Sequence, residues 1–176
     1  MNKKIQVLVT TSMLAALTCV ATMVIKVPTI GTNGYVNIGD TMVLISALVL
    51  GNPFGAMAAG LGSALADLLA GYAAYVPGTF LIKFLMAYVF CIVFISCKDK
   101  NVNTFVSFII GSILAEIVMV GGYFFYEAVF LGYGYAAATS IPSNMIQGIT
   151  CIVLANCMLP VLSRMKYYGK PLEARG

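Results

Sequence analysis

The sequence predicts an all-α integral membrane protein with six transmembrane helices and cytoplasmic N- and C-termini, folded as a single membrane domain over residues 1–176. Of the 176 residues, 61% are hydrophobic and only 9% are charged. Soluble domains carry about 25% charged residues. Because a helix that crosses the hydrocarbon core needs about 20 apolar residues, the chain has room for roughly six crossings joined by short connections.

Apolar segments and the breaks between them define the expected helices. Lys26 and Pro28 end the first segment, and a polar Gly/Thr/Asn-rich stretch follows it. The turn signal Gly51-Asn52-Pro53 separates the second from the third. Pro77 suits the first turn of the fourth, and the polar link 98–101 precedes the fifth. The six expected helices cover residues 5–25, 40–50, 54–70, 77–97, 104–130 and 142–162.

The distribution of basic residues sets the expected orientation. With six crossings, one side of the membrane receives eight basic residues: Lys3, Lys4, Lys98, Lys100, Arg164, Lys166, Lys170 and Arg175. The opposite side receives only Lys26. Since basic residues favour the cytoplasmic side, both termini are expected in the cytoplasm of a multi-pass protein of the cell membrane. Lys83, the tenth basic residue, falls inside the fourth segment.

Two absences from the sequence limit its chemistry. The chain has no G-x-x-x-x-G-K-[ST] phosphate-binding loop, so ATP hydrolysis would have to come from a partner. It has no histidine, the commonest metal ligand and proton shuttle. The five cysteines show no C-x-x-C spacing and are interpreted as small core residues. We therefore expect no metal site, no cofactor and no catalytic residue.

Polar residues inside the apolar segments are the candidates for a binding site. An ionised side chain near the bilayer centre costs about 2.5–3.5 kcal/mol, which marks it as functional when a partner exists. Counted by depth, these residues converge on the outer half of the bundle, where tyrosines also gather and would close over a planar ring. The predicted substrate-binding residues are Asn37, Asp40, Asp67, Tyr75, Lys83, Tyr123, Glu127, Asn144 and Gln147.

Each of these residues also has a purely structural interpretation. Asp40, expected at the outer face, would cap the second helix. Asp67 and Lys83 would form a buried ion pair between the third and fourth helices. Glu127, near the outer boundary, would be solvated. Glu116, nearer mid-depth, would make a structural hydrogen bond, and the tyrosines would form an interfacial belt.

Small residues line one face of the first helix. They are Ser12, Ala15, Ala16 and Cys19. Side chains of this size let helix backbones approach closely. This face is either part of the core or a docking stripe for another membrane subunit.

Four stretches of the chain resemble the S components of energy-coupling factor (ECF) vitamin transporters, and most of all the branch for vitamin B6 and hydroxymethylpyrimidine. They are Gly34-Tyr35-Val36-Asn37-Ile38-Gly39-Asp40, Gly51-Asn52-Pro53-Phe54-Gly55-Ala56, Gly60-Leu61-Gly62-Ser63-Ala64-Leu65-Ala66-Asp67-Leu68 and Tyr75-Val76-Pro77-Gly78-Thr79-Phe80-Leu81-Ile82-Lys83. The resemblance implies a subunit that binds a vitamin from outside and joins a transmembrane coupling subunit and two ATPases. It also implies that the small-residue face of the first helix docks that coupling subunit.

Two other functions remain open at this stage. One is a self-sufficient proton-coupled transporter that uses Glu116 and Glu127 as proton carriers. The other is a membrane-embedded enzyme acting on a lipid, with Asp40, Asp67 or Glu116 as acid or base. The sequence shows no D-x-x-D metal cluster and no two carboxylates one helical turn apart within a span.

Overall fold

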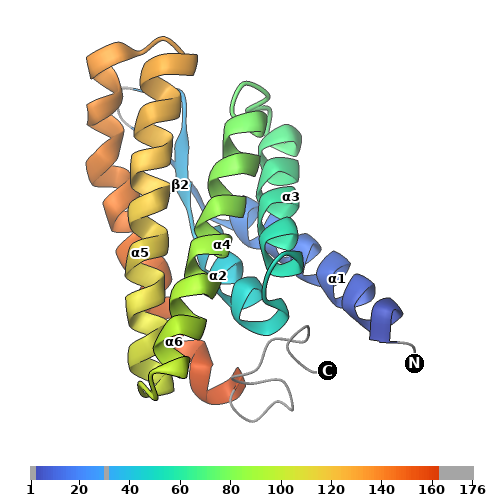
Figure 1. The fold of residues 1–176 in the computed structure, drawn as a ribbon. Coiled ribbons are helices and arrows are strands. Elements are labelled where there is room, and N and C mark those ends of the chain that lie inside the picture. The colour runs from blue at the N-terminus through green and yellow to red at the C-terminus, as the bar shows by residue number, and fades with distance from the viewer. Residues whose placement is uncertain (1–2, 30–31, 163–176) are drawn as a thin grey trace.

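The computed structural model describes residues 3–29 and 32–162, and it shows a bundle of six α-helices with one short antiparallel sheet (Figure 1). The helices are α1 (Lys3–Val24), α2 (Gly39–Leu50), α3 (Phe54–Leu69), α4 (Val76–Asp99), α5 (Thr104–Phe125) and α6 (Ile141–Leu162). The sheet pairs β1 (Lys26–Pro28) with β2 (Tyr35–Asn37). A π-helical turn η1 (Tyr126–Phe130) and a 3₁₀ helix η2 (Gly134–Ser140) connect α5 to α6.

Helix α4 lies at the centre of the packing and contacts α2, α3 and α5. Its Phe90 ring is fully buried and meets the Phe108 ring of α5 edge to face, with 5.1 Å between the ring centroids. Helix α1 packs against α3 at Gly62, where an added Cβ atom would lie 2.4 Å from the carbonyl oxygen of Ala15. Only glycine allows the two backbones to approach this closely.

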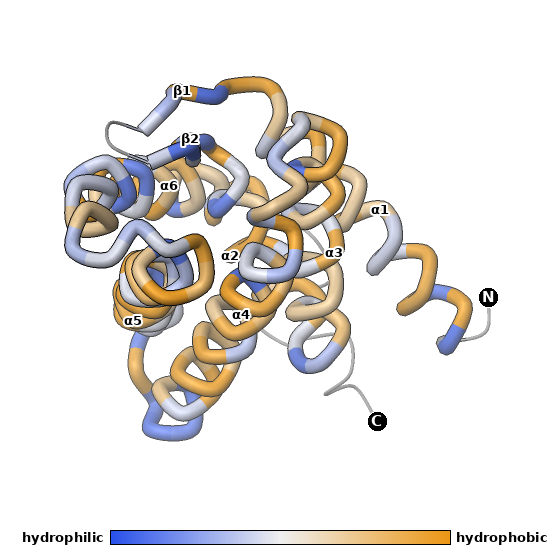
Figure 2. The backbone as a smooth tube through the Cα atoms, turned by 90° about the horizontal axis from the view of Figure 1, so that it is seen from above, coloured by the Kyte–Doolittle hydropathy of each residue, from blue (hydrophilic) through white to orange (hydrophobic). Residues whose placement is uncertain are grey.

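The outward faces of the helices are apolar, as a lipid environment requires. Leu8, Leu69, Ile117 and Ile149 are examples of large hydrophobic side chains that lie exposed. Viewed along the bundle, hydrophilic residues gather at the sheet and at the turn between α4 and α5 (Figure 2). Such extensive apolar surface is not found on soluble monomers, so the structure is that of a membrane protein.

Within residues 3–29 and 32–162, four helical segments are long and apolar enough to cross a membrane: Lys4–Val24, Val76–Asp99, Thr104–Phe130 and Gly134–Leu162. Helices α2 and α3 are apolar but shorter, with 12 and 16 residues. At 1.5 Å per residue they extend about 18 and 24 Å, less than the roughly 30 Å hydrocarbon core. The number of crossings therefore does not follow from helix length alone.

The start of α2 corrects the expected depth of Asp40. Strand β2 runs down along the bundle and leads directly into α2, so α2 begins well inside the protein (Figure 1). Asp40 consequently has an exposed fraction of 0% rather than facing the outer surface. It does not cap the helix either, because Ile38 occupies the N-cap position and the Asn37 side chain accepts a hydrogen bond from the Gly39 amide at 2.8 Å.

Candidate functional site

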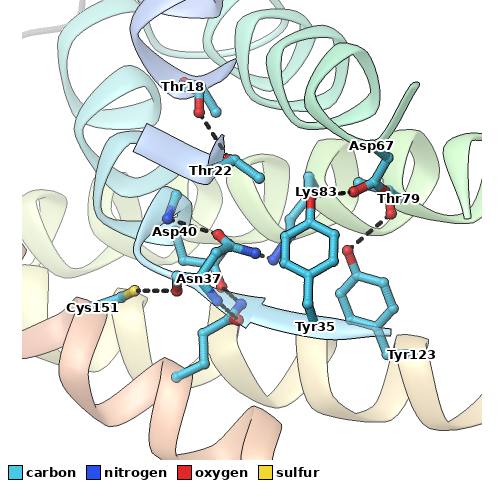
Figure 3. A network of polar contacts seen from close by, with 12 residues as sticks. Thr18, Thr22, Tyr35, Asn37, Asp40, Asp67, Thr79, Lys83, Tyr123 and Cys151 are labelled. Carbon is cyan, nitrogen blue, oxygen red and sulfur yellow. Dashed lines mark hydrogen bonds and ion pairs between the residues drawn. The ribbon is translucent and has the colours of Figure 1, made fainter. Parts of the chain in front are cut away.

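A buried ion pair joins Lys83 of α4 to Asp40 of α2 (Figure 3). Lys83 is 2% exposed. The sequence interpretation paired Lys83 with Asp67 instead, and the structure corrects this: the ammonium meets Asp40, whose depth along the bundle was misjudged. An isolated charge in this interior would be costly, so the two groups stabilise each other.

Gln147 of α6 ties this ion pair to strand β2. Its Nε2 donates to Asp40 Oδ2 at 2.5 Å, and its Oε1 accepts from the Asn37 amide at 2.6 Å. One turn further along α6, the Cys151 thiol donates to the Asn37 carbonyl oxygen at 3.6 Å. Residues 147 and 151 share a face of α6, which explains how the helix holds the strand from the side.

A second cluster surrounds Asp67 near the end of α3. The Tyr35 hydroxyl of β2 donates to Asp67 Oδ1 at 2.6 Å. The hydroxyls of Thr79 on α4 and Tyr123 on α5 share a hydrogen bond of 3.0 Å, and the Lys83 ammonium lies 5.2 Å from the centre of the Tyr123 ring. Strand β2 and the ends of α3, α4 and α5 thus meet at Asp67 and at the neighbouring Thr79–Tyr123 pair.

Glu127 lies on the π-helical turn and is buried, not solvated as its sequence position suggested. The Tyr75 hydroxyl donates to its Oε1 at 3.0 Å, and the Ser140 hydroxyl donates to its Oε2 at 2.5 Å. Burial and the Glu127 charge raise the pKa of the Tyr75 phenol. π-Helical turns occur frequently at functional sites, because they redirect a side chain out of the regular helical register.

These clusters enclose a small cavity between β2 and the neighbouring ends of α3, α4, α5 and α6. Its lining residues are Thr29, Gly34, Tyr35, Asn37, Asp67, Tyr75, Thr79, Tyr123, Glu127, Asn144 and Gln147. The cavity volume is about 20 Å³, which is room for about one water molecule. The side chains themselves fill most of the space, so a molecule of vitamin size enters only if part of the lining moves.

Seven of the nine predicted substrate-binding residues line this cavity, and Asp40 and Lys83 form the ion pair attached to it through Gln147. Sequence reasoning missed Thr29, Gly34 and Thr79 as site residues, and it counted Tyr35 only among the tyrosines expected to close over a planar ring. Thr79 precedes Lys83 by one helical turn and so shares its face, which was a usable signal. In the described ranges 3–29 and 32–162, no three cysteine or acidic side chains gather closely enough to hold a metal ion.

The small-residue face of α1 lies outside this site. Ser12 and Ala16 are exposed, whereas Ala15 and Cys19 are half-buried. Ala15 packs against a small apolar cluster that includes Leu50 and Ala58. The face is therefore partly internal and partly open to the surroundings. Of the basic residues used for orientation, Arg164, Lys166, Lys170 and Arg175 lie outside the described residues.

Comparisons with a family model and with a solved structure indicate the same class of molecule. Residues 2–164 match the family described as ECF-type riboflavin transporter, S component. The solved structure of the S component of a bacterial ECF transporter is similar over 91% of this chain and 96% of that one, with a TM-score of 0.68 and 25% sequence identity. A Pyrococcus woesei protein, described as an uncharacterized protein in the gap 3′ region, is 30% identical over 145 residues, covering 82% of this chain and 93% of its own.

Proposed function

The chain belongs to the family of ECF-type riboflavin transporter S components, the substrate-binding subunits of ECF transporters, and on this premise we propose that it captures a vitamin B6 vitamer or a hydroxymethylpyrimidine-type precursor from outside the cell. The family is one of transporter subunits, not enzymes. A coupling subunit and two ATPases would drive the uptake, because the sequence has no phosphate-binding loop of its own.

The charge balance of the cavity supports a small heteroaromatic ligand with hydrogen-bond donors. Carboxylates of Asp67 and Glu127 line the cavity, and Asp40 lies beside it. Two ammonium groups lie near these three carboxylates: Lys83 is already bound to Asp40, and Lys26 lies 5.7 Å from the centre of the Tyr35 ring. Such a site favours a neutral or cationic ligand whose hydroxyl or amino groups donate to carboxylates. It disfavours an anionic vitamin such as pantothenate, since like charges repel in a low-dielectric site.

Tyrosine rings at the cavity would supply apolar contacts to the same ligand. Tyr35 and Tyr72 lie with their ring centroids 4.6 Å apart, and both Tyr35 and Tyr123 line the cavity. A flat ring can stack between such side chains. Because Tyr35 comes from β2 and occupies the cavity, we infer that the ligand enters when this strand shifts, and that ligand donors replace the Tyr35 hydroxyl at Asp67.

Riboflavin is the second candidate, favoured by the description of the family that the chain matches. Its three fused rings need more space than a single ring, and the present cavity of about 20 Å³ would have to enlarge further to hold them. The two ligands differ enough in size and in absorption spectrum for one binding experiment to separate them.

We expect the purified protein to bind its vitamin without ATP, because the cavity lies wholly within this chain. Native mass spectrometry of the purified protein should find a co-purified B6 vitamer or hydroxymethylpyrimidine, and calorimetry should rank those compounds above riboflavin, pantothenate and biotin. Preferential binding of riboflavin would overturn the vitamin assignment but keep the subunit's role. Accumulation of the ligand against a gradient in liposomes that contain this protein alone would instead support a proton-coupled transporter.

We also propose six membrane crossings with both termini in the cytoplasm. The first residue of α1, the last residue of α6 and the turns α2–α3 and α4–α5 lie toward one end of the bundle (Figure 1). Helix α2 would cross together with the extended segment before it. In a variant lacking the five native cysteines, Lys100→Cys should react with a membrane-impermeant thiol reagent only from the cytoplasm, and Tyr135→Cys only from outside. Both side chains are exposed, and labelling of both from the same side would contradict the topology.

The outward part of the small-residue face on α1 is proposed to dock the coupling subunit. We expect Ala16→Leu to reduce co-purification with that subunit without changing vitamin binding, because the residue is exposed and close helix approach needs small side chains. Ala15→Leu should in addition lower the melting temperature, since Ala15 contacts the internal cluster. Ala138→Leu, exposed on η2, is the matched control. An unchanged complex with Ala16→Leu would show that this face does not dock.

A further inference from the structure

An apolar groove between α5 and α6 opens on the lateral surface of the bundle, separate from the polar cavity. Its volume is about 480 Å³, and its walls include Ile117, Val120, Met145 and Ile149. The two helices lie side by side along their length (Figure 1). In a membrane, this groove faces lipid. Its walls alone would accept any hydrocarbon chain.

One carboxyl group makes this groove unusual. Glu116 lines it and is only 6% exposed, and neither Oε1 nor Oε2 has a hydrogen-bond partner among the described residues. The carboxyl group packs beneath Gly148, where an added Cβ atom would lie 3.0 Å from Oε2. A buried polar group without a partner is costly, and hydrocarbon chains offer no donor to satisfy it.

The interior of the bundle does not supply the missing partner. The charges of Asp40 and Lys83 act on Glu116 from that side. Lys83, however, is bound to Asp40, and no hydrogen bond joins either residue to Glu116 in the described part of the chain. Because Glu116 lines the groove, a molecule bound there could supply the missing partner once the wall at Gly148 shifts to uncover the two buried oxygens.

We propose that the α5–α6 groove binds a membrane-dissolved molecule with an apolar body and a hydroxyl group, and that the hydroxyl hydrogen-bonds to Glu116. A hydroxyl suits the site in either protonation state of the carboxyl group. It donates to an ionised carboxylate, and it both donates to and accepts from a neutral carboxyl. This site is independent of the vitamin proposed above, because its walls and its opening are different.

A second groove on the same molecule provides an internal control. It lies between α3 and α4, has a volume of about 450 Å³, and is lined by apolar residues that include Leu65, Leu68 and Leu81. No charged residue is among its lining. A molecule held only by apolar contacts should occupy the two grooves about equally. A molecule held by Glu116 should prefer the first.

The test uses a photoreactive long-chain primary alcohol and the matching photoreactive alkane, each added to the full-length protein in lipid nanodiscs. After irradiation, peptide mass spectrometry measures the label on each groove. We expect the alcohol to prefer the α5–α6 groove about fivefold, the effect of one hydrogen bond of about 1 kcal/mol. The alkane should show no preference. Glu116→Leu should remove the preference of the alcohol.

A second variant blocks the groove without touching the carboxyl group. An added Cβ atom at Gly121 meets nothing within 4 Å, so Gly121→Leu fills the groove rather than the core. It should abolish alcohol labelling there and leave the melting temperature unchanged. Equal alcohol labelling of the two grooves in the unchanged protein would overturn the proposal. So would a preference that persists in Glu116→Leu, or, if that variant does not fold, one that persists in Gly121→Leu.

Discussion

Lys83→Met is expected to destabilise the protein by about 3–5 kcal/mol, because it leaves the Asp40 carboxylate buried without its counter-ion. Asp40 is fully buried, and its remaining partner, Gln147, supplies one neutral hydrogen bond. Methionine matches the length of the lysine stem, so the loss reports charge rather than packing. Thermal or denaturant unfolding in detergent measures the change.

The double variant Lys83→Met/Asp40→Leu should be more stable than Lys83→Met alone, because it removes the stranded charge as well. Lys100→Met, at an exposed position at the end of α4, controls for loss of a positive charge and should change stability by less than about 0.5 kcal/mol. If the loss of unfolding free energy in the double variant equalled the sum of the losses in Lys83→Met and Asp40→Leu, the ion pair would not explain the effect. Vitamin binding by the double variant then shows whether the pair also contacts the ligand.

Asp67→Asn is expected to weaken vitamin binding by about 2 kcal/mol or more, roughly thirtyfold in Kd. The substitution keeps the size of the side chain and one acceptor oxygen but removes the negative charge that would receive ligand donors. Asp67 lines the cavity and already accepts from Tyr35 at 2.6 Å. Calorimetry on variants with an unchanged melting temperature measures the difference.

The variant Tyr35→Phe tests whether Asp67 contacts the ligand directly or only holds the site together through its hydrogen bond to Tyr35. Phenylalanine keeps the ring and removes only the hydroxyl that occupies Asp67 in the closed cavity. If ligand donors replace that hydroxyl, the variant should bind the vitamin as tightly as the unchanged protein or more tightly. A loss equal to that of Asp67→Asn would mean that the Tyr35–Asp67 bond itself holds the site together, and that Asp67 does not contact the ligand.

The helices of this protein could be predicted from the sequence because their signals are local. Long apolar runs become helices, since the lipid interior offers no partner for an open backbone. The break at Gly51-Asn52-Pro53 and the position of Pro77 mark helix boundaries that the structure shares within a few residues. Candidate site residues could also be identified from the sequence. Asp40, Lys83 and Glu127 stand out in apolar segments because burying a charge is costly.

Only the tertiary structure decided which partners the polar side chains have and how deep in the bundle they lie. Lys83 meets Asp40, 43 residues away, only because β2 enters the bundle and lowers the start of α2, and no local pattern encodes that path. Thr29 and Thr79 were missed because a neutral hydroxyl in a loop or helix carries little penalty until its surroundings are known. Glu127 is buried because the π-helical turn and η2 bring Ser140 against it. Sequence can show which groups need partners, but the packing of distant segments decides which partners they find.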